Sequence, residues 1–174
     1  MPLNKYAPQV STHRRTQSAI LAGTKELITH VGLAKMSMIE IADTSQVSRA
    51  TLYNHYRDKD SVIASLCESE ISRLIAIAHS APNAIDALEL LSIQISTDAA
   101  LAHMRVHDPA PLAGALAAVD HPLWAAFSQA LAIITGSQVV ADLALRWLVG
   151  QVLQPLTPED SRLAAELLIS RANI

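Results

Sequence analysis

Apolar side chains recur at helical spacing along most of the chain, and short polar or proline-containing segments interrupt the pattern. The first periodic stretch runs from about residue 12 to Val31, and Gly32 follows it as a typical residue beyond a helix end. Later breaks fall at "APN" (81–83), "HDPAP" (107–111), "DHP" (120–122) and "GS" (136–137). These breaks leave about nine predicted helices and no predicted strand. The sequence therefore predicts an all-α fold.

Two short predicted helices near the N-terminus begin at serines. Ser37 precedes "MIEIADTS" with Glu40 three residues later, which is the pattern of a capping box. Ser48 opens "SRATLYNHY" in the same capping role. Only a tight connection at Gln46 and Val47 separates the two helices, and a longer helix precedes them. This arrangement has the dimensions of a helix-turn-helix.

Charged side chains divide the chain into two parts. Residues 1–59 carry eight basic side chains against four acidic ones, whereas residues 60–174 carry five against twelve. We expect a basic domain at 1–59, with residues 1–11 as a mobile arm because they lack periodicity and contain Pro2 and Pro8. We expect an acidic helical bundle at 60–174. A basic domain joined to an acidic one indicates that the first binds a polyanion.

The remaining composition indicates a cytoplasmic protein. No stretch reaches the roughly 18 uninterrupted apolar residues of a membrane span, and the N-terminus has no apolar signal region. The single cysteine, Cys67, cannot form an internal disulfide, which suits a reducing compartment, and we expect it to be a buried apolar residue. We therefore expect no membrane partner.

The polar residues of "SRATLYNHY" and the segment after it suit contact with double-stranded DNA. The second helix of a helix-turn-helix lies in the major groove with its first residues nearest the bases. Arg49 offers a donor fork to guanine, Thr51 a hydroxyl or methyl group, and Asn54 an amide to adenine. Phosphate or sugar contacts are expected from Tyr53, His55, Tyr56 and Lys59.

The segment from about Arg15 to Leu66 resembles the DNA-binding domain of the tetracycline-repressor (TetR) family of bacterial transcriptional regulators. The resemblance lies in "ILAGTKELITHVG", "SMIEIA", "VSRATLYNHY" and "KDSVIASL", and it covers about a third of the chain. The family pattern implies DNA contacts at Ser37, Ser48, Arg49, Thr51, Tyr53, Asn54, His55 and Lys59. The sequence departs from the pattern at Gln46, where glycine is common, and at Ile39, where a polar residue is common.

The resemblance also implies that the bundle forms a homodimer and encloses a pocket for a small-molecule effector. The helix at about 138–153 is apolar nearly all round and the helix at about 158–171 carries one apolar stripe, so we expect these last two helices to form the dimer interface. Pocket candidates are the aromatic, histidine and methionine side chains His103, Met104, His107, Trp124, Phe127 and Trp147. The predicted function is that of a ligand-responsive repressor that binds a palindromic operator as a homodimer.

An all-helical metal-dependent enzyme or small-molecule carrier is the alternative function. His103 and His107 stand four residues apart, a spacing that can place two imidazoles on one metal ion, and His121 is a possible third ligand. Such residues are also common in cores and on solvated surfaces. The sequence shows no nucleophile–base motif and no glycine-rich phosphate loop. We therefore expect no catalysis, no cofactor and no metal site.

Overall fold

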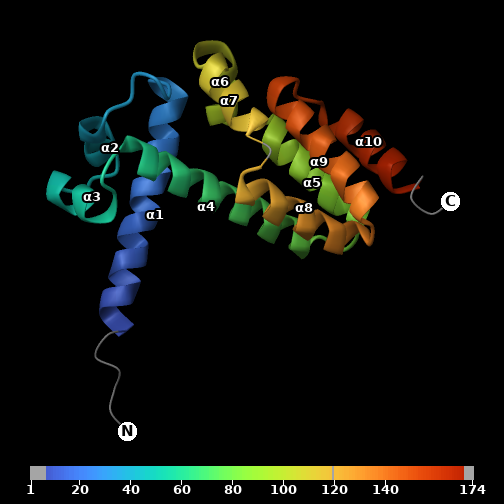
Figure 1. Ribbon diagram of the computed structural model, residues 1–174, viewed down its shortest axis with the longest axis horizontal. Coiled ribbons are helices and arrows are strands. Elements are labelled where there is room, and N and C mark those ends of the chain that lie inside the picture. The colour runs from blue at the N-terminus through green and yellow to red at the C-terminus, as the bar shows by residue number, and fades with distance from the viewer. Residues whose placement is uncertain (1–6, 119, 171–174) are drawn as a thin grey trace, which may run out of the picture. The chain divides into compact units, whose positions relative to one another are not determined.

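The computed structural model describes residues 7–118 and 120–170, and within them the secondary structure is ten α-helices without a strand. The chain divides into two compact units, Met1–Cys67 and Glu68–Ile174 (Figure 1). The prediction of an all-α protein is therefore confirmed. None of the described helices is both long enough and apolar enough to cross a membrane.

The first unit contains α1 (Ala7–His30), α2 (Met38–Thr44), α3 (Arg49–His55) and the start of α4 (Lys59–Ser80). Helix α1 begins at Ala7, so the expected mobile arm at 1–11 is wrong for residues 7–11, while residues 1–6 lie outside the described part. Pro8 did not prevent this start, because a proline in the first helical turn loses no hydrogen bond. Gly32 follows α1 with a φ of 85°, as predicted for a helix stop.

The second unit contains the rest of α4 and six further helices. These are α5 (Ala84–Ser96), α6 (Ala99–His107), α7 (Pro109–Ala117), α8 (Pro122–Thr135), α9 (Gln138–Leu153) and α10 (Pro158–Ser170). Between the breaks at 81–83 and 107–111 the sequence predicted a single helix from 84 towards 104, whereas the structure ends α5 at Ser96. Asp98 starts α6 by accepting a hydrogen bond from the Leu101 amide at 2.9 Å. This local cap accounts for the tenth helix.

Helix α5 packs against α8, α9 and α10, and α8 packs along α9 (Figure 1). Their shared core contains fully buried leucines, among them Leu88, Leu91 and Leu131. A buried polar contact lies within this core. Ser92 Oγ is 2.6 Å from Ser161 Oγ and 2.5 Å from the terminal amide of Gln151, so α5, α9 and α10 satisfy one another's polar groups.

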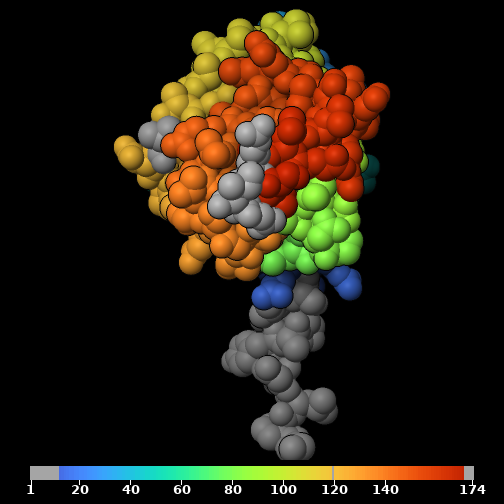
Figure 2. Space-filling view, turned by 90° about the vertical axis from the view of Figure 1, so that its right-hand side faces the viewer, coloured from blue at the N-terminus to red at the C-terminus, as the bar shows by residue number. Residues whose placement is uncertain are grey.

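Helices α9 and α10 also carry apolar side chains that point away from the core. Figure 2 shows the face of the second unit on which the surfaces of these two helices adjoin. Five leucine and valine side chains of α9 and α10 are between 52% and 70% exposed. They are Val139, Leu143, Leu153, Leu163 and Leu167, and we call them the outward stripe. Exposed apolar patches of this kind mark surfaces that bind another protein.

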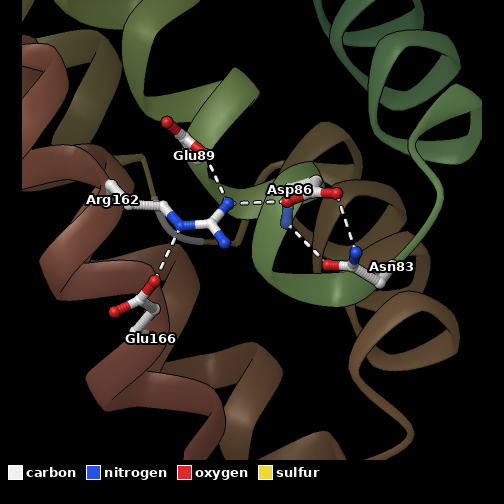
Figure 3. Close-up of polar contacts among 5 residues, drawn as sticks. All are labelled: Asn83, Asp86, Glu89, Arg162 and Glu166. Carbon is white, nitrogen blue, oxygen red and sulfur yellow. Dashed lines mark hydrogen bonds and ion pairs between the residues drawn. The ribbon is translucent and has the colours of Figure 1, made fainter.

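Arg162 of α10 joins α10 to α5 through three carboxylates (Figure 3). Its Nη1 lies 2.6 Å from Asp86 and 2.8 Å from Glu89, both on α5, and its Nε lies 2.8 Å from Glu166 on α10. Hydrogen bonds first to Glu89, then to Glu166 and Asp86, raise the pKa of the Arg162 guanidinium above its usual value. Asn83 caps α5 by accepting from the Asp86 amide at 2.9 Å.

Candidate nucleic-acid interface

The helix-turn-helix of α2 and α3 forms as the sequence predicts. Ser37 and Glu40 make both hydrogen bonds of a capping box, and Ser48 Oγ accepts from the Thr51 amide at 3.0 Å. Ile41 and Leu52 are fully buried and fix the two helices to the interior of the unit. Both serines were expected to contact DNA, and in this structure their hydroxyls cap α2 and α3.

The turn between the helices requires a left-handed residue. Gln46 has a φ of 56°, a conformation in which the Cβ of an ordinary residue crowds the following carbonyl. The Val47 amide donates to the Ala42 carbonyl at 3.0 Å, and the Gln46 amide donates to Asp43 at 3.1 Å. The turn is therefore closed by the backbone, with glutamine in a position that favours glycine.

A glycine that the sequence analysis did not single out controls the contact between α1 and the turn. Gly23 of α1 faces Ser45, and a Cβ on Gly23 would lie 2.9 Å from both the N and the Cα of Ser45. Ser45 Oγ donates to the Ile20 carbonyl at 3.3 Å, also on α1. A glycine inside a helical pattern was the available signal, because it marks close approach or a break.

The side chains of α3 divide into an exposed and a buried set. Arg49, Tyr53 and Asn54 are exposed, with Tyr53 at 54%, and Thr51 and His55 are half-buried. Within the described residues, Arg49, Tyr53 and Asn54 make no side-chain hydrogen bond or ion pair to the protein. They are therefore free to bind an external partner.

Tyr56 belongs to the buried set, which corrects the expectation that it contacts DNA. Its side chain is only 6% exposed, and its buried Oη has no hydrogen-bond partner in the described part of the chain. Tyr56 follows Leu52 by four residues, and positions four apart share one face of a helix. The same inward face that buries Leu52 therefore buries Tyr56.

Lys59 and His55 make contacts that the sequence did not reveal. Lys59 Nζ donates to the Leu33 carbonyl at 3.1 Å, so this ammonium also holds the start of α4 to the segment after α1. The ring of His55 stacks on His13 of α1, with centroids 4.1 Å apart and planes inclined by 18°. No sequence pattern links these two histidines, because they lie on different helices.

The histidine and aromatic candidates of the second unit do not form one site. Phe127 is part of the core, and Met104, Trp124 and Trp147 pack against it. The rings of His103 and His107 are 4.2 Å apart, while His121 caps α8 by accepting from the Leu123 amide at 3.3 Å. The described residues contain no group of three or more His, Cys, Asp or Glu side chains that could hold a metal ion. Cys67 of α4 is exposed, contrary to the expectation that it is a buried apolar residue.

A capped helix-turn-helix with an exposed polar second helix defines the first unit as a DNA-binding domain. Residues 20–66 match the family described as bacterial regulatory proteins, tetR family. The first unit therefore carries the DNA-binding domain of this family of transcriptional regulators. No curated protein matches the chain.

Solved structures of similar fold extend the likeness to most of the chain. The dihydroxyacetone kinase operon activator DhaS is 15% identical with a TM-score of 0.64, covering 90% of this chain and 95% of its own. A transcriptional regulator from Streptomyces coelicolor A3(2) is 18% identical with a TM-score of 0.61, covering 89% and 98%. A TetR-like transcriptional regulator from Rhodococcus sp. RHA1 is 14% identical with a TM-score of 0.56, covering 98% of both chains. At these identities the likeness concerns the fold alone.

Proposed function

We propose that the protein is a ligand-responsive, cytoplasmic repressor that binds a palindromic operator as a homodimer. The observation that carries the proposal is the exposed polar face of α3, where Arg49, Tyr53 and Asn54 are free of protein partners within the described residues. Buried Leu52 anchors the opposite face, so α3 is held rigidly while its polar side chains remain available.

The homodimer is supported by the outward stripe of α9 and α10. A monomer would leave these five apolar side chains in water, whereas a second copy would cover them. A twofold dimer also presents two copies of α3, and such pairs match half-sites roughly 34–36 Å apart on the duplex. A palindromic operator follows from this symmetry.

Response to a ligand requires that the ligand binds the two conformations of the protein with different affinity. The second unit, which carries most of the acidic residues, is the part available for this role, and Phe127, Met104, Trp124 and Trp147 of the pocket candidates belong to its core or pack against it. Whether the protein represses or activates transcription needs its own measurement, because DhaS, a protein of similar fold, is described as an operon activator. Transcription in vitro, measured with and without the protein on a promoter that contains a DNA site the protein binds, decides between repression and activation.

Selection of duplexes from a random pool, followed by gel shifts over a range of salt concentrations, tests DNA recognition. Arg49→Lys is a sharp variant, because it keeps the charge but loses the bidentate fork that distinguishes guanine. We expect Arg49→Lys to lose about 1–3 kcal/mol of discrimination at one base position while retaining the salt dependence of binding. No sequence-selective, salt-sensitive retardation of any duplex by the wild-type protein would refute the proposed function.

Lys59→Gln tests the contact with the DNA backbone. Loss of a phosphate contact weakens binding to all sequences and lowers the salt slope by about one. Because Lys59 also donates to Leu33, the free energy of unfolding is measured on the same variant. A changed stability with an unchanged salt slope would assign Lys59 to the fold alone.

A further inference from the structure

His13 and His55 form a stacked pair that joins α1 to the end of α3. Their ring centroids are 4.1 Å apart and their planes are inclined by only 18°. His13 is exposed and His55 is half-buried. His55 is the last residue of α3, so the pair borders the helix whose exposed face carries Tyr53 and Asn54.

The surroundings of His55 disfavour its protonation in the free protein. Desolvation, followed by the charge of His13, lowers the pKa of His55. The basic side chains of the neighbouring segments are Arg14, Arg15, Arg49 and Arg57. Two of the acidic side chains in these segments already have partners: Glu40 accepts a hydrogen bond from the Ser37 amide, and Asp58 lies 2.8 Å from Arg57. The other two, Asp43 and Asp60, are exposed. Two imidazolium rings in stacked contact would also repel each other.

A phosphate group of a DNA duplex would reverse this preference. An anion within a few ångströms stabilises a protonated imidazole, and both nitrogens of that ring become donors. Phosphate oxygens are the commonest hydrogen-bond acceptors in protein–DNA interfaces. Because the pair lies at the edge of α3, a duplex bound to α3 brings its backbone towards both rings.

We propose that His13 and His55 together form a proton-binding element of the DNA surface, which takes up a proton when a duplex phosphate docks beside it. His13 thereby becomes part of the DNA interface although it lies on α1, outside the helix-turn-helix. The inference rests on the proposed function, because the duplex supplies the negative charge.

Proton uptake couples DNA affinity to pH with a definite sign. If the bound state holds more protons than the free state, affinity rises as pH falls through the range in which the free pair is neutral. Each proton taken up changes the dissociation constant by about tenfold per pH unit in that range. Because the pKa of His55 is lowered in the free protein, the effect is expected from below the ordinary histidine pKa of about 6.5 up to the higher pKa that a neighbouring phosphate gives His55.

Fluorescence anisotropy with a labelled duplex obtained by selection, at constant ionic strength, measures this slope. The wild-type protein is expected to bind up to about tenfold more tightly for each unit of acidification. His13→Gln and His55→Gln should each flatten the slope, whereas His30→Gln, at an exposed histidine in the last turn of α1, should keep it. An equal slope in all four proteins, or weaker wild-type binding at low pH, would overturn the proposal.

A measurement without DNA tests the pair itself. Histidine ring signals in NMR follow the titration of His55 in the free protein, and His13→Gln should raise its pKa because a neighbouring charge is removed. An unchanged titration would show that the rings are not coupled and would overturn the proposal. Failure of the wild-type protein to bind any duplex would refute the proposed function, whereas binding with an unaltered slope in the variants would refute the histidine element alone.

Discussion

Gly23 of α1 lies so close to Ser45 that no side chain fits between them. A Cβ at position 23 would lie 2.9 Å from both the backbone N and the Cα of Ser45, and closer still to the Ser45 Oγ. Two of these atoms are backbone, so rotation of a side chain cannot relieve the overlap. The contact brings α1 against the C-terminal end of α2, and it therefore fixes the position of the turn that leads into α3.

Replacing Gly23 by alanine should destabilise the protein. Inside a helix, alanine is about 1 kcal/mol more favourable than glycine. The overlap of its Cβ with Ser45 should outweigh this gain, because it should cost about 1–3 kcal/mol and push α1 away from the turn. Urea denaturation measures the net effect, and Ala22→Ser, at an exposed neighbour, is the control. A gain in stability for Gly23→Ala would show that the two segments are not in close contact.

Replacing Gln46 by glycine should stabilise the protein. The left-handed φ of 56° costs an ordinary residue about 1 kcal/mol, and glycine avoids this cost, although its more flexible unfolded chain offsets part of the gain. Gln46→Ala is the matched control, because it removes the side chain but keeps the Cβ. If both variants change the free energy of unfolding equally, the backbone conformation is not the cause.

Tyr53 and Tyr56 should respond in opposite ways to removal of the hydroxyl group. Tyr56→Phe removes a buried Oη without a hydrogen-bond partner in the described part of the chain, so stability should stay unchanged or rise by about 1 kcal/mol. DNA affinity should stay unchanged. Tyr53→Phe, at an exposed side chain, should leave stability unchanged and weaken DNA binding. Anisotropy and thermal denaturation on both variants check the assignment, and a loss of affinity in Tyr56→Phe alone would reverse it.

Charges placed in the outward stripe should convert the proposed dimer to a monomer. The double variant Leu143→Glu, Leu167→Glu would bury carboxylates against a second copy, which is strongly unfavourable. Sedimentation equilibrium at micromolar concentration should give the mass of one chain, and operator affinity should fall because only one half-site is held. Val106→Glu, at an exposed side chain of α6, should remain a dimer. A wild-type monomer would remove the basis of this prediction.

Arg162→Gln should weaken the attachment of α10 to α5. The variant leaves Asp86, Glu89 and Glu166 without the guanidinium that all three contact, so the carboxylates repel one another. The melting temperature should fall, and added salt should reduce the difference from wild type because it screens the repulsion. Arg146→Gln, at an exposed arginine of α9, controls for the loss of one charge. Equal melting temperatures at low salt would show that the cluster contributes nothing to stability.

The sequence by itself determined the helical fold and the two short helices of the helix-turn-helix. These features depend on interactions within a few residues, such as the Ser37–Glu40 capping box and the bond from the Thr51 amide to Ser48, and such interactions are visible as spacing. The boundary between α5 and α6 was not predicted, because apolar residues continue across the Asp98 cap.

The tertiary structure alone decided which side chains of the predicted interface are available. It buried Tyr56, joined Lys59 to Leu33, stacked His13 on His55 and placed Arg162 on Asp86, a residue 76 positions away. Each of these contacts unites residues from different parts of the chain. Helical periodicity gives the side of a helix on which a residue lies, but the packing of whole helices decides what that side meets.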